Sequence, residues 1–157
     1  MSLNYTKKTL EHFRHPQNIG ELNKPDARAT IGNMVCGDQL SFSIKVKNNK
    51  IQDIKFLSFG CASNIATASV MTEIVKGMTL EEAKKFNWDK IVMELGGLPK
   101  QKIHCSVLAV EGLKKVIAEY ESKHSKTKKV VAKKNSLSVK TKLQSKPKPK
   151  SKTKIKK

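Results

Sequence analysis

The strongest constraint on the fold of this chain is a change in its hydrophobic period at Gly60. Before Gly60, apolar and polar residues alternate over residues 40–46 and again over residues 54–58. Alternation with a period of two is typical of strands with one buried face, and the Asn48-Asn49 pair between the two runs is a turn signal. The pattern predicts a β-hairpin over residues 40–58. After Gly60 the apolar residues recur every three or four positions, which predicts helices from there on.

The predicted helices and their ends follow from local signals. Residues 4–15 have helical spacing and end at His15-Pro16, because the residue before a proline avoids the α region. Residues 61–76 are followed by Gly77, and Thr79 with Glu82 forms a T-x-x-E capping box that begins the next helix. Two further helices are predicted over residues 88–95 and 105–121.

The order of these elements indicates the fold class. The segment ARATIG, residues 27–32, predicts a first strand before the hairpin, so the strands come first and most helices afterwards. Such an order favours an antiparallel sheet with helices on one face. The sequence therefore predicts an α+β domain.

The formal charge of +19 is distributed unevenly. Residues 122–157 hold 15 lysines and no acidic residue, whereas residues 1–121 hold 17 basic and 13 acidic residues, a net charge of +4. The lysines alternate with Ser, Thr and Pro, which leaves too few apolar residues to offset the entropy of ordering. We expect a domain at 1–121 and a disordered Lys-rich tail at 122–157. The tail is interpreted as solubilising, or as a weak electrostatic contact with nucleic acid.

Two features indicate the compartment. The chain has no run of about 18 apolar residues and no signal-peptide core near residue 1, so a cytoplasmic protein without membrane contact is predicted. Three cysteines in a reducing compartment do not favour a disulfide framework. Their shared role is therefore expected to be chemical.

All three cysteines lie at predicted ends of elements. Cys36 stands two residues before Asp38 in the turn after the first strand, Cys61 begins a helix, and Cys105 follows His104 at the start of the last helix. Helix N-termini favour thiolates, which bind metals or attack sulfur. The spacings of 25 and 44 positions differ from paired C-x-x-C zinc sites, so the fold must assemble the ligands. Three thiolates with Asp38 or His104 would give a tetrahedral ion four donors.

Each of these residues also has a plainer interpretation. A free cysteine is often a small buried hydrophobe. Asp38 follows a glycine and is alternatively a residue that satisfies turn amides, and His104 is alternatively a helix-start residue bonded to backbone. His12 and His15 are interpreted as surface or packing residues of the first helix and its exit.

Five segments of the chain together resemble the IscU/NifU-type iron–sulfur cluster assembly scaffolds. They are HFRHPQNIG (12–20), GNMVCGDQ (32–39), FGCASNIATAS (59–69), TEIVKGMTLEEA (72–83) and LPKQKIHCSVLA (98–109). They occur in register over about residues 4–121. The resemblance implies a three-stranded antiparallel sheet with helices packed on it.

The resemblance also implies a function and residue roles. Cys36, Cys61 and Cys105 would be cluster ligands and sulfur acceptors, with Cys105 the first persulfide acceptor. Asp38 would tune cluster lability or bind zinc or iron, and His104 is an alternative fourth ligand. Such a carrier, which is not a turnover enzyme, accepts persulfide sulfur from a cysteine desulfurase and iron from a donor. It then passes a [2Fe–2S] cluster to apoproteins, as a monomer or a cluster-bridged dimer, and the purified form can hold zinc instead.

Two departures from the family pattern leave open questions. Residues 98–102 read L-P-K-Q-K, with Lys100 and Gln101 where many members read L-P-P-V-K, so release by a chaperone is in doubt. The Lys-rich tail has no counterpart in the family pattern. Two other functions stay open: a zinc-bound sulfurtransferase that relays persulfide without building a cluster, and a nucleic-acid-associated protein that acts through its tail. The 44-position spacing leaves no room for the insertion typical of the sulfurtransferase branch.

Overall fold

The structure is a computed structural model that describes residues 4–35 and 37–140, with side chains described as far as Ser125. The chain divides into two units, Met1–Ser122 and Lys123–Lys157, and the sheet lies in the first. The helices are α1 (Lys7–Arg14), α2 (Ala62–Val75), α3 (Leu80–Lys84), α4 (Trp88–Glu94) and α5 (Ile103–Lys140), with a 3₁₀ turn, η1, at Lys100–Lys102. The strands are β1 (Ala27–Gly32), β2 (Gln39–Lys47) and β3 (Lys50–Phe59).

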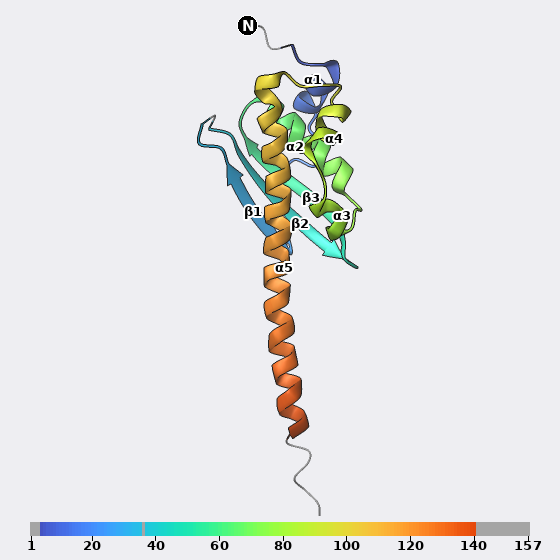
Figure 1. Cartoon of the computed structure of the whole chain (residues 1–157), viewed down its shortest axis with the longest axis vertical. Coiled ribbons are helices and arrows are strands. Elements are labelled where there is room, and N and C mark those ends of the chain that lie inside the picture. Colours follow the sequence, from blue (N-terminus) through green and yellow to red (C-terminus); the bar gives the residue numbers. More distant parts are fainter. Residues whose placement is uncertain (1–3, 36, 141–157) are drawn as a thin grey trace, which may run out of the picture. The chain divides into compact units, whose positions relative to one another are not determined.

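The three strands form one antiparallel sheet in the order β1-β2-β3 (Figure 1). The turn between β2 and β3 is made by Asn48 and Asn49, whose φ angles of 52° and 60° lie in the left-handed region that asparagine tolerates. The predicted hairpin, the predicted first strand and the three-stranded antiparallel sheet are therefore confirmed.

The alternating apolar residues of the hairpin form the inner face of the sheet. Their side chains are completely buried at Leu40, Phe42, Ile44, Ile54 and Phe56. The buried apolar residues of α2 and α5 belong to the same hydrophobic core, so both helices pack on this face. The predicted α+β class, with helices covering one face of the sheet, is confirmed.

Helix α5 lies very close to the sheet at Gly112. A Cβ atom at this position would lie 2.5 Å from Cε2 of Phe42 and 3.0 Å from Cγ2 of Ile31. Because the Phe42 ring is completely buried, it cannot move aside without disturbing the core. The glycine thus lets the helix lie directly on the sheet.

We therefore expect Gly112→Ala to destabilise the protein. Overpacking typically costs about 1–3 kcal/mol, which outweighs a gain in helix propensity of about 0.5–1 kcal/mol. The urea midpoint of unfolding should fall, whereas Glu111→Ala on the exposed side of the same helix should leave it nearly unchanged. An unchanged or raised midpoint for Gly112→Ala would contradict this packing.

Helix α2 is buried on almost all sides. Ten of its 14 residues are buried, including polar Ser63, Asn64 and Thr67. Helix α1 contacts it, and the Ser69 hydroxyl of α2 is hydrogen-bonded to Nδ1 of His12 at 2.9 Å. Helix α2 is therefore held in place by packing on almost all of its sides.

The last helix differs from its prediction at both ends. It begins at Ile103, two residues before Cys105, and it runs to Lys140, so the predicted end at about Glu121 is wrong. Lysine is a good helix former, and no Gly or Pro occurs between Leu113 and Lys146 to end the helix. The predicted disordered tail at residues 122–157 and the domain boundary at residue 121 stay predictions, and residues 141–157 lie outside the described residues.

Helices long and apolar enough to cross a membrane are absent from the described part of the chain.

Candidate metal centre

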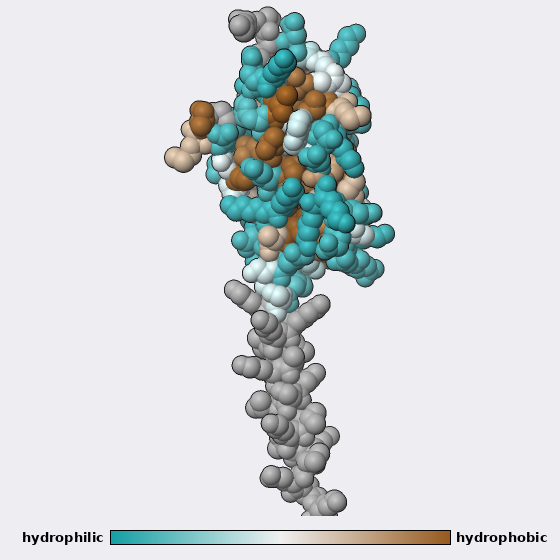
Figure 2. Space-filling view, in the orientation of Figure 1, coloured by the Kyte–Doolittle hydropathy of each residue, from teal (hydrophilic) through white to brown (hydrophobic). Residues whose placement is uncertain are grey.

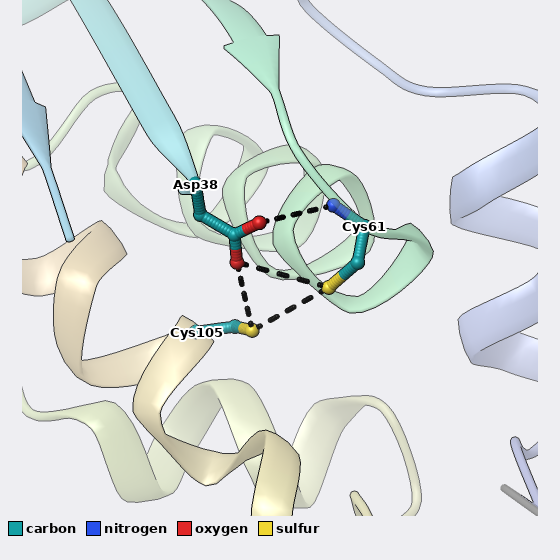
Figure 3. Close-up of side chains that lie close together, drawn as sticks. All are labelled: Asp38, Cys61 and Cys105. Atoms are coloured by element: carbon teal, nitrogen blue, oxygen red, sulfur yellow. Dashed lines mark hydrogen bonds between the residues drawn. The ribbon is translucent and has the colours of Figure 1, made fainter. Parts of the chain in front are cut away.

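Three predicted site residues converge at one end of the sheet, where β2 begins and β3 ends (Figure 3). In the antiparallel register Gln39 pairs with Phe59, so the residue before β2 lies beside those after β3. This register places Asp38 next to Cys61, which is the N-cap of α2. Cys105 reaches the same place from the first turn of α5.

The donor atoms form a nearly equilateral triangle. Cys61 Sγ lies 3.8 Å from Cys105 Sγ, and Asp38 Oδ2 lies 3.8 Å from the first sulfur and 3.7 Å from the second. For a tetrahedral ion with metal–sulfur bonds of about 2.3 Å and metal–oxygen bonds of about 2.1 Å, ligand separations are about 3.8 Å between sulfurs and about 3.6 Å between sulfur and oxygen. The triangle fits three ligands of one tetrahedral ion.

The two oxygens of Asp38 have different contacts. Oδ1 accepts a hydrogen bond of 3.2 Å from the backbone N–H of Cys61, while Oδ2 faces the two sulfurs. Only 5% of the Asp38 surface is exposed, so the carboxylate is held in a largely water-free pocket. One oxygen thus fixes the residue to the start of α2, and the other is free to face a metal.

The two thiols have opposite shifts in pKa. The hydrogen bond from the Cys105 thiol, aided by the Asn64 backbone N–H, lowers the pKa of Cys61 from 9.0 to about 5. The hydrogen bond to Cys61 and burial raise the pKa of Cys105. Near pH 7 the pair therefore holds one proton, on Cys105, and one thiolate, on Cys61. The charge of that thiolate in turn raises the pKa of Lys102.

Of the other two predicted site residues, the structure describes only His104. His104 Nε2 lies 3.5 Å from Cys105 Sγ, but His104 is not part of the group whose donor atoms lie within 4.8 Å of one another. Cys36 lies outside the described residues. The roles predicted for Cys36 and His104 as ligands stay predictions.

Gly60 is a site residue that the sequence analysis missed. A Cβ atom at this position would lie 2.6 Å from both Asp38 Oδ1 and Asn64 Nδ2. A glycine between a strand and a helix is a weak sequence signal, because it is equally common in ordinary turns. Its role becomes visible only when Asp38 is placed against it.

We expect Gly60→Ala to displace the Asp38 carboxylate and to weaken metal binding by about 10–100-fold, the usual effect of disturbing groups that orient a ligand. A titration of the metal-free protein with Co²⁺ measures this. Gly32→Ala is the matched control, because its Cβ would meet the backbone oxygen of Asp38 at an ordinary 3.5 Å. Equal Co²⁺ affinity in Gly60→Ala and the unmodified chain would contradict the proposed orientation of Asp38.

Exposed apolar side chains lie close in sequence to the site residues. Met34 and Val35, in the loop between β1 and β2, are almost fully exposed, and Phe59, two residues before Cys61, is 78% exposed. Figure 2 shows hydrophobic side chains at the surface of the first unit, including the protruding loop between β1 and β2. We refer to Met34, Val35 and Phe59 as the apolar rim.

Comparisons with known proteins place the chain in a family. The model of the NifU-like N terminal domain matches residues 4–127. The chain is 49% identical over 126 residues to the iron-sulfur cluster assembly scaffold protein IscU 1 of Archaeoglobus fulgidus, covering 80% of this chain and 82% of that protein. It is 43% identical over 128 residues to the scaffold protein IscU of Aquifex aeolicus, with the same coverage.

A solved structure agrees with the observed fold. The N-terminal part of a nitrogen-fixing NifU-like protein from Brucella abortus superimposes with a TM-score of 0.60 at 24% identity, over 75% of this chain and 94% of that one. The architecture is therefore shared. Together with the match over residues 4–127, these findings show that the chain belongs to the NifU-like N-terminal domain family.

Proposed function

We propose that this chain is a scaffold on which an iron–sulfur cluster is assembled and from which it is passed to other proteins. The observation that carries the proposal is the triangle of Cys61 Sγ, Cys105 Sγ and Asp38 Oδ2, whose edges fit ligands of one tetrahedral ion. The relatives from Archaeoglobus fulgidus and Aquifex aeolicus, named as assembly scaffolds, support it. Iron and the cluster are cargo here, and the chain acts as a carrier.

In this proposal the two sulfurs of the triangle bind iron of a [2Fe–2S] cluster. Cys36 is the third sulfur ligand, and Asp38 or His104 completes the set. Zinc accepts the same sulfur, nitrogen and oxygen donors, so the isolated protein can carry zinc in place of iron. Zinc in a purified sample is therefore compatible with the scaffold function.

Sulfur arrives as a persulfide from a cysteine desulfurase, and Cys105 is the proposed first acceptor. Its thiolate attacks the outer sulfur of the donor persulfide, a new S–S bond forms on Cys105, and the donor cysteine leaves as a thiolate. Cys105 is completely buried and protonated at neutral pH, so it must become accessible and lose its proton first. His104 Nε2, 3.5 Å from Cys105 Sγ, is placed to take that proton.

Partner contacts are proposed around the same end of the sheet. The apolar rim offers exposed hydrophobic surface close in sequence to Cys61, which suits short-lived contacts with a desulfurase or with receiving apoproteins. Residues 98–102 are the candidate chaperone segment, altered at Lys100 and Gln101. A monomer and a cluster-bridged dimer are both compatible with this proposal.

The direct test is anaerobic assembly followed by transfer. The full chain is incubated with ferrous iron, cysteine and a cysteine desulfurase, and visible absorption is followed before and after addition of an apo-ferredoxin. We expect cluster absorption to appear on this chain and then to move to the ferredoxin. Mass spectrometry without iron should find the added sulfur on Cys105.

The same experiment separates the two other functions. A zinc-bound sulfurtransferase would acquire persulfide but no visible absorption, because zinc is colourless. A chain ended at Ser122 should assemble the cluster as the full chain does. If it did not, and if the full chain bound nucleic acid with a steep dependence on salt, the tail would be the functional part.

A further inference from the structure

We propose that Asn64 is a positioning residue for Asp38, and that together with Gly60 it holds the carboxylate so that Oδ2 faces the two sulfurs. The inference rests on the proposed metal-binding role of the triangle and deepens it. Asn64 does not itself contact the metal in this proposal, since its side chain acts through Asp38.

The first observation is that the side chains of Asn64 and Asp38 both lie close to Gly60. Asn64 Nδ2 and Asp38 Oδ1 each lie 2.6 Å from the point where a Gly60 Cβ would stand, so the amide and the carboxylate crowd the same side of the turn. The amide N–H₂ carries partial positive charge, which favours a carboxylate oxygen on this side. The amide and the carboxylate therefore share the space beside Gly60, and in this proposal removal of the amide gives Asp38 room to rotate.

The second observation is that Asn64 is poorly explained by packing alone. Its side chain is completely buried, Nδ2 donates to Ser58 Oγ at 3.1 Å, and Oδ1 has no hydrogen-bond partner among the described residues. Leaving such an acceptor unsatisfied costs about 1–3 kcal/mol, a cost that an apolar side chain at this place would avoid. Because Asn64 is costly for folding and lies beside Gly60 and Asp38, a role at the site explains it better than packing does.

A third observation ties Asn64 to the sulfur side of the site. It is the third residue of α2 after the Cys61 N-cap, so it lies in the helix turn that Cys61 begins. The backbone N–H of Cys61 donates to Asp38 Oδ1 at 3.2 Å. One turn of helix therefore carries a sulfur ligand, the N–H that binds Asp38, and the amide proposed to position it.

The test compares Asn64→Ala in two backgrounds, with Co²⁺ as the probe. In the otherwise unmodified chain, Asn64→Ala should weaken Co²⁺ binding by about tenfold and change the visible Co²⁺ spectrum, as loss of a ligand-orienting group typically does. In the Asp38→Ala background the same substitution should have no further effect, because the group through which Asn64 acts is gone. Ser69→Ala is the matched control, since it removes a buried polar group of the same helix that bonds His12 and Gln17.

Each result decides a different statement. Equal weakening in both backgrounds, or none in either, would overturn the role of Asn64, whereas a chain that binds no Co²⁺ before any substitution would overturn the site itself. Urea unfolding checks that Asn64→Ala is folded. If Asn64→Ala is unfolded, the same Co²⁺ titrations are made with Asn64→Ser in the two backgrounds, and their results decide.

Discussion

In the metal-free protein, the rate at which iodoacetamide alkylates Cys61 is expected to stay constant from pH 8 down to about pH 6. The hydrogen bond from the Cys105 thiol lowers the pKa of Cys61 to about 5, so this thiol is already ionised over the whole range. An ordinary thiol with a pKa of about 8.5 loses about tenfold in rate for each pH unit below that value.

The shape of this profile, and not the rate at a single pH, is the informative quantity. At pH 7 a pKa near 5 in place of 9.0 raises the thiolate fraction about 100-fold. The intrinsic nucleophilicity of a thiolate, however, falls by about 40–100-fold when its pKa falls by four units, which offsets most of that gain. The two effects nearly cancel in the rate at pH 7. The flat pH profile remains informative because intrinsic nucleophilicity does not change with pH.

Mass spectrometry of the Cys61 peptide measures the profile, with the urea-unfolded protein as the reference for an ordinary thiol. Cys105→Ala removes the hydrogen-bond donor, so in this variant the alkylation rate of Cys61 should again fall as the pH is lowered through the neutral range. A rate in the folded protein that falls tenfold per unit between pH 8 and pH 6 would contradict the charge distribution described here.

Replacing Asp38 is expected to lengthen the life of the bound cluster, and Asp38→Asn is the more informative variant. A carboxylate oxygen is a hard donor among soft sulfurs, so this is the position at which a ligand exchanges most easily. Asparagine keeps an oxygen that can accept from the Cys61 N–H, as Oδ1 does now, and loses the charge of Oδ2. Asp38→Ala loses both.

The pair of variants separates the two roles of Asp38. Asp38→Ala should also lower the free energy of unfolding by about 1–3 kcal/mol, because it leaves the Cys61 N–H without its acceptor, whereas Asp38→Asn should largely retain stability. Decay of visible absorption in the presence of a chelator gives the lifetime. If stability fell in both variants while the lifetime stayed the same, Asp38 would be only a residue that supports the turn.

Much of the fold was predictable because it follows from local rules. The alternation from Leu40 to Phe56 specifies a hairpin whose inner face is apolar, and Thr79 with Glu82 forms the predicted capping box. The placing of Cys61 at a helix start was predictable for the same reason, since Gly60 marks the change of period. These signals need only neighbours in sequence.

The geometry of the site was less predictable, because it depends on pairing between distant segments. The Gln39–Phe59 register brings Asp38 to Cys61, and nothing in either segment alone specifies that pairing. The role of Asn64 was missed because a polar residue in a helix pattern normally points to solvent, whereas α2 is buried on almost all sides. The end of α5 was missed because lysine favours helix even where no packing partner is expected.

The most direct test of the account is the visible spectrum after anaerobic reconstitution of the full chain, beside Cys61→Ser and Cys105→Ser. The two sulfurs lie 3.8 Å apart from different helices, and the account holds that they bind one cluster together. It predicts cluster absorption in the unmodified chain and its loss in each variant, with both variants still folded by circular dichroism. Full absorption in either serine variant would show that this sulfur is not a ligand and would contradict the account.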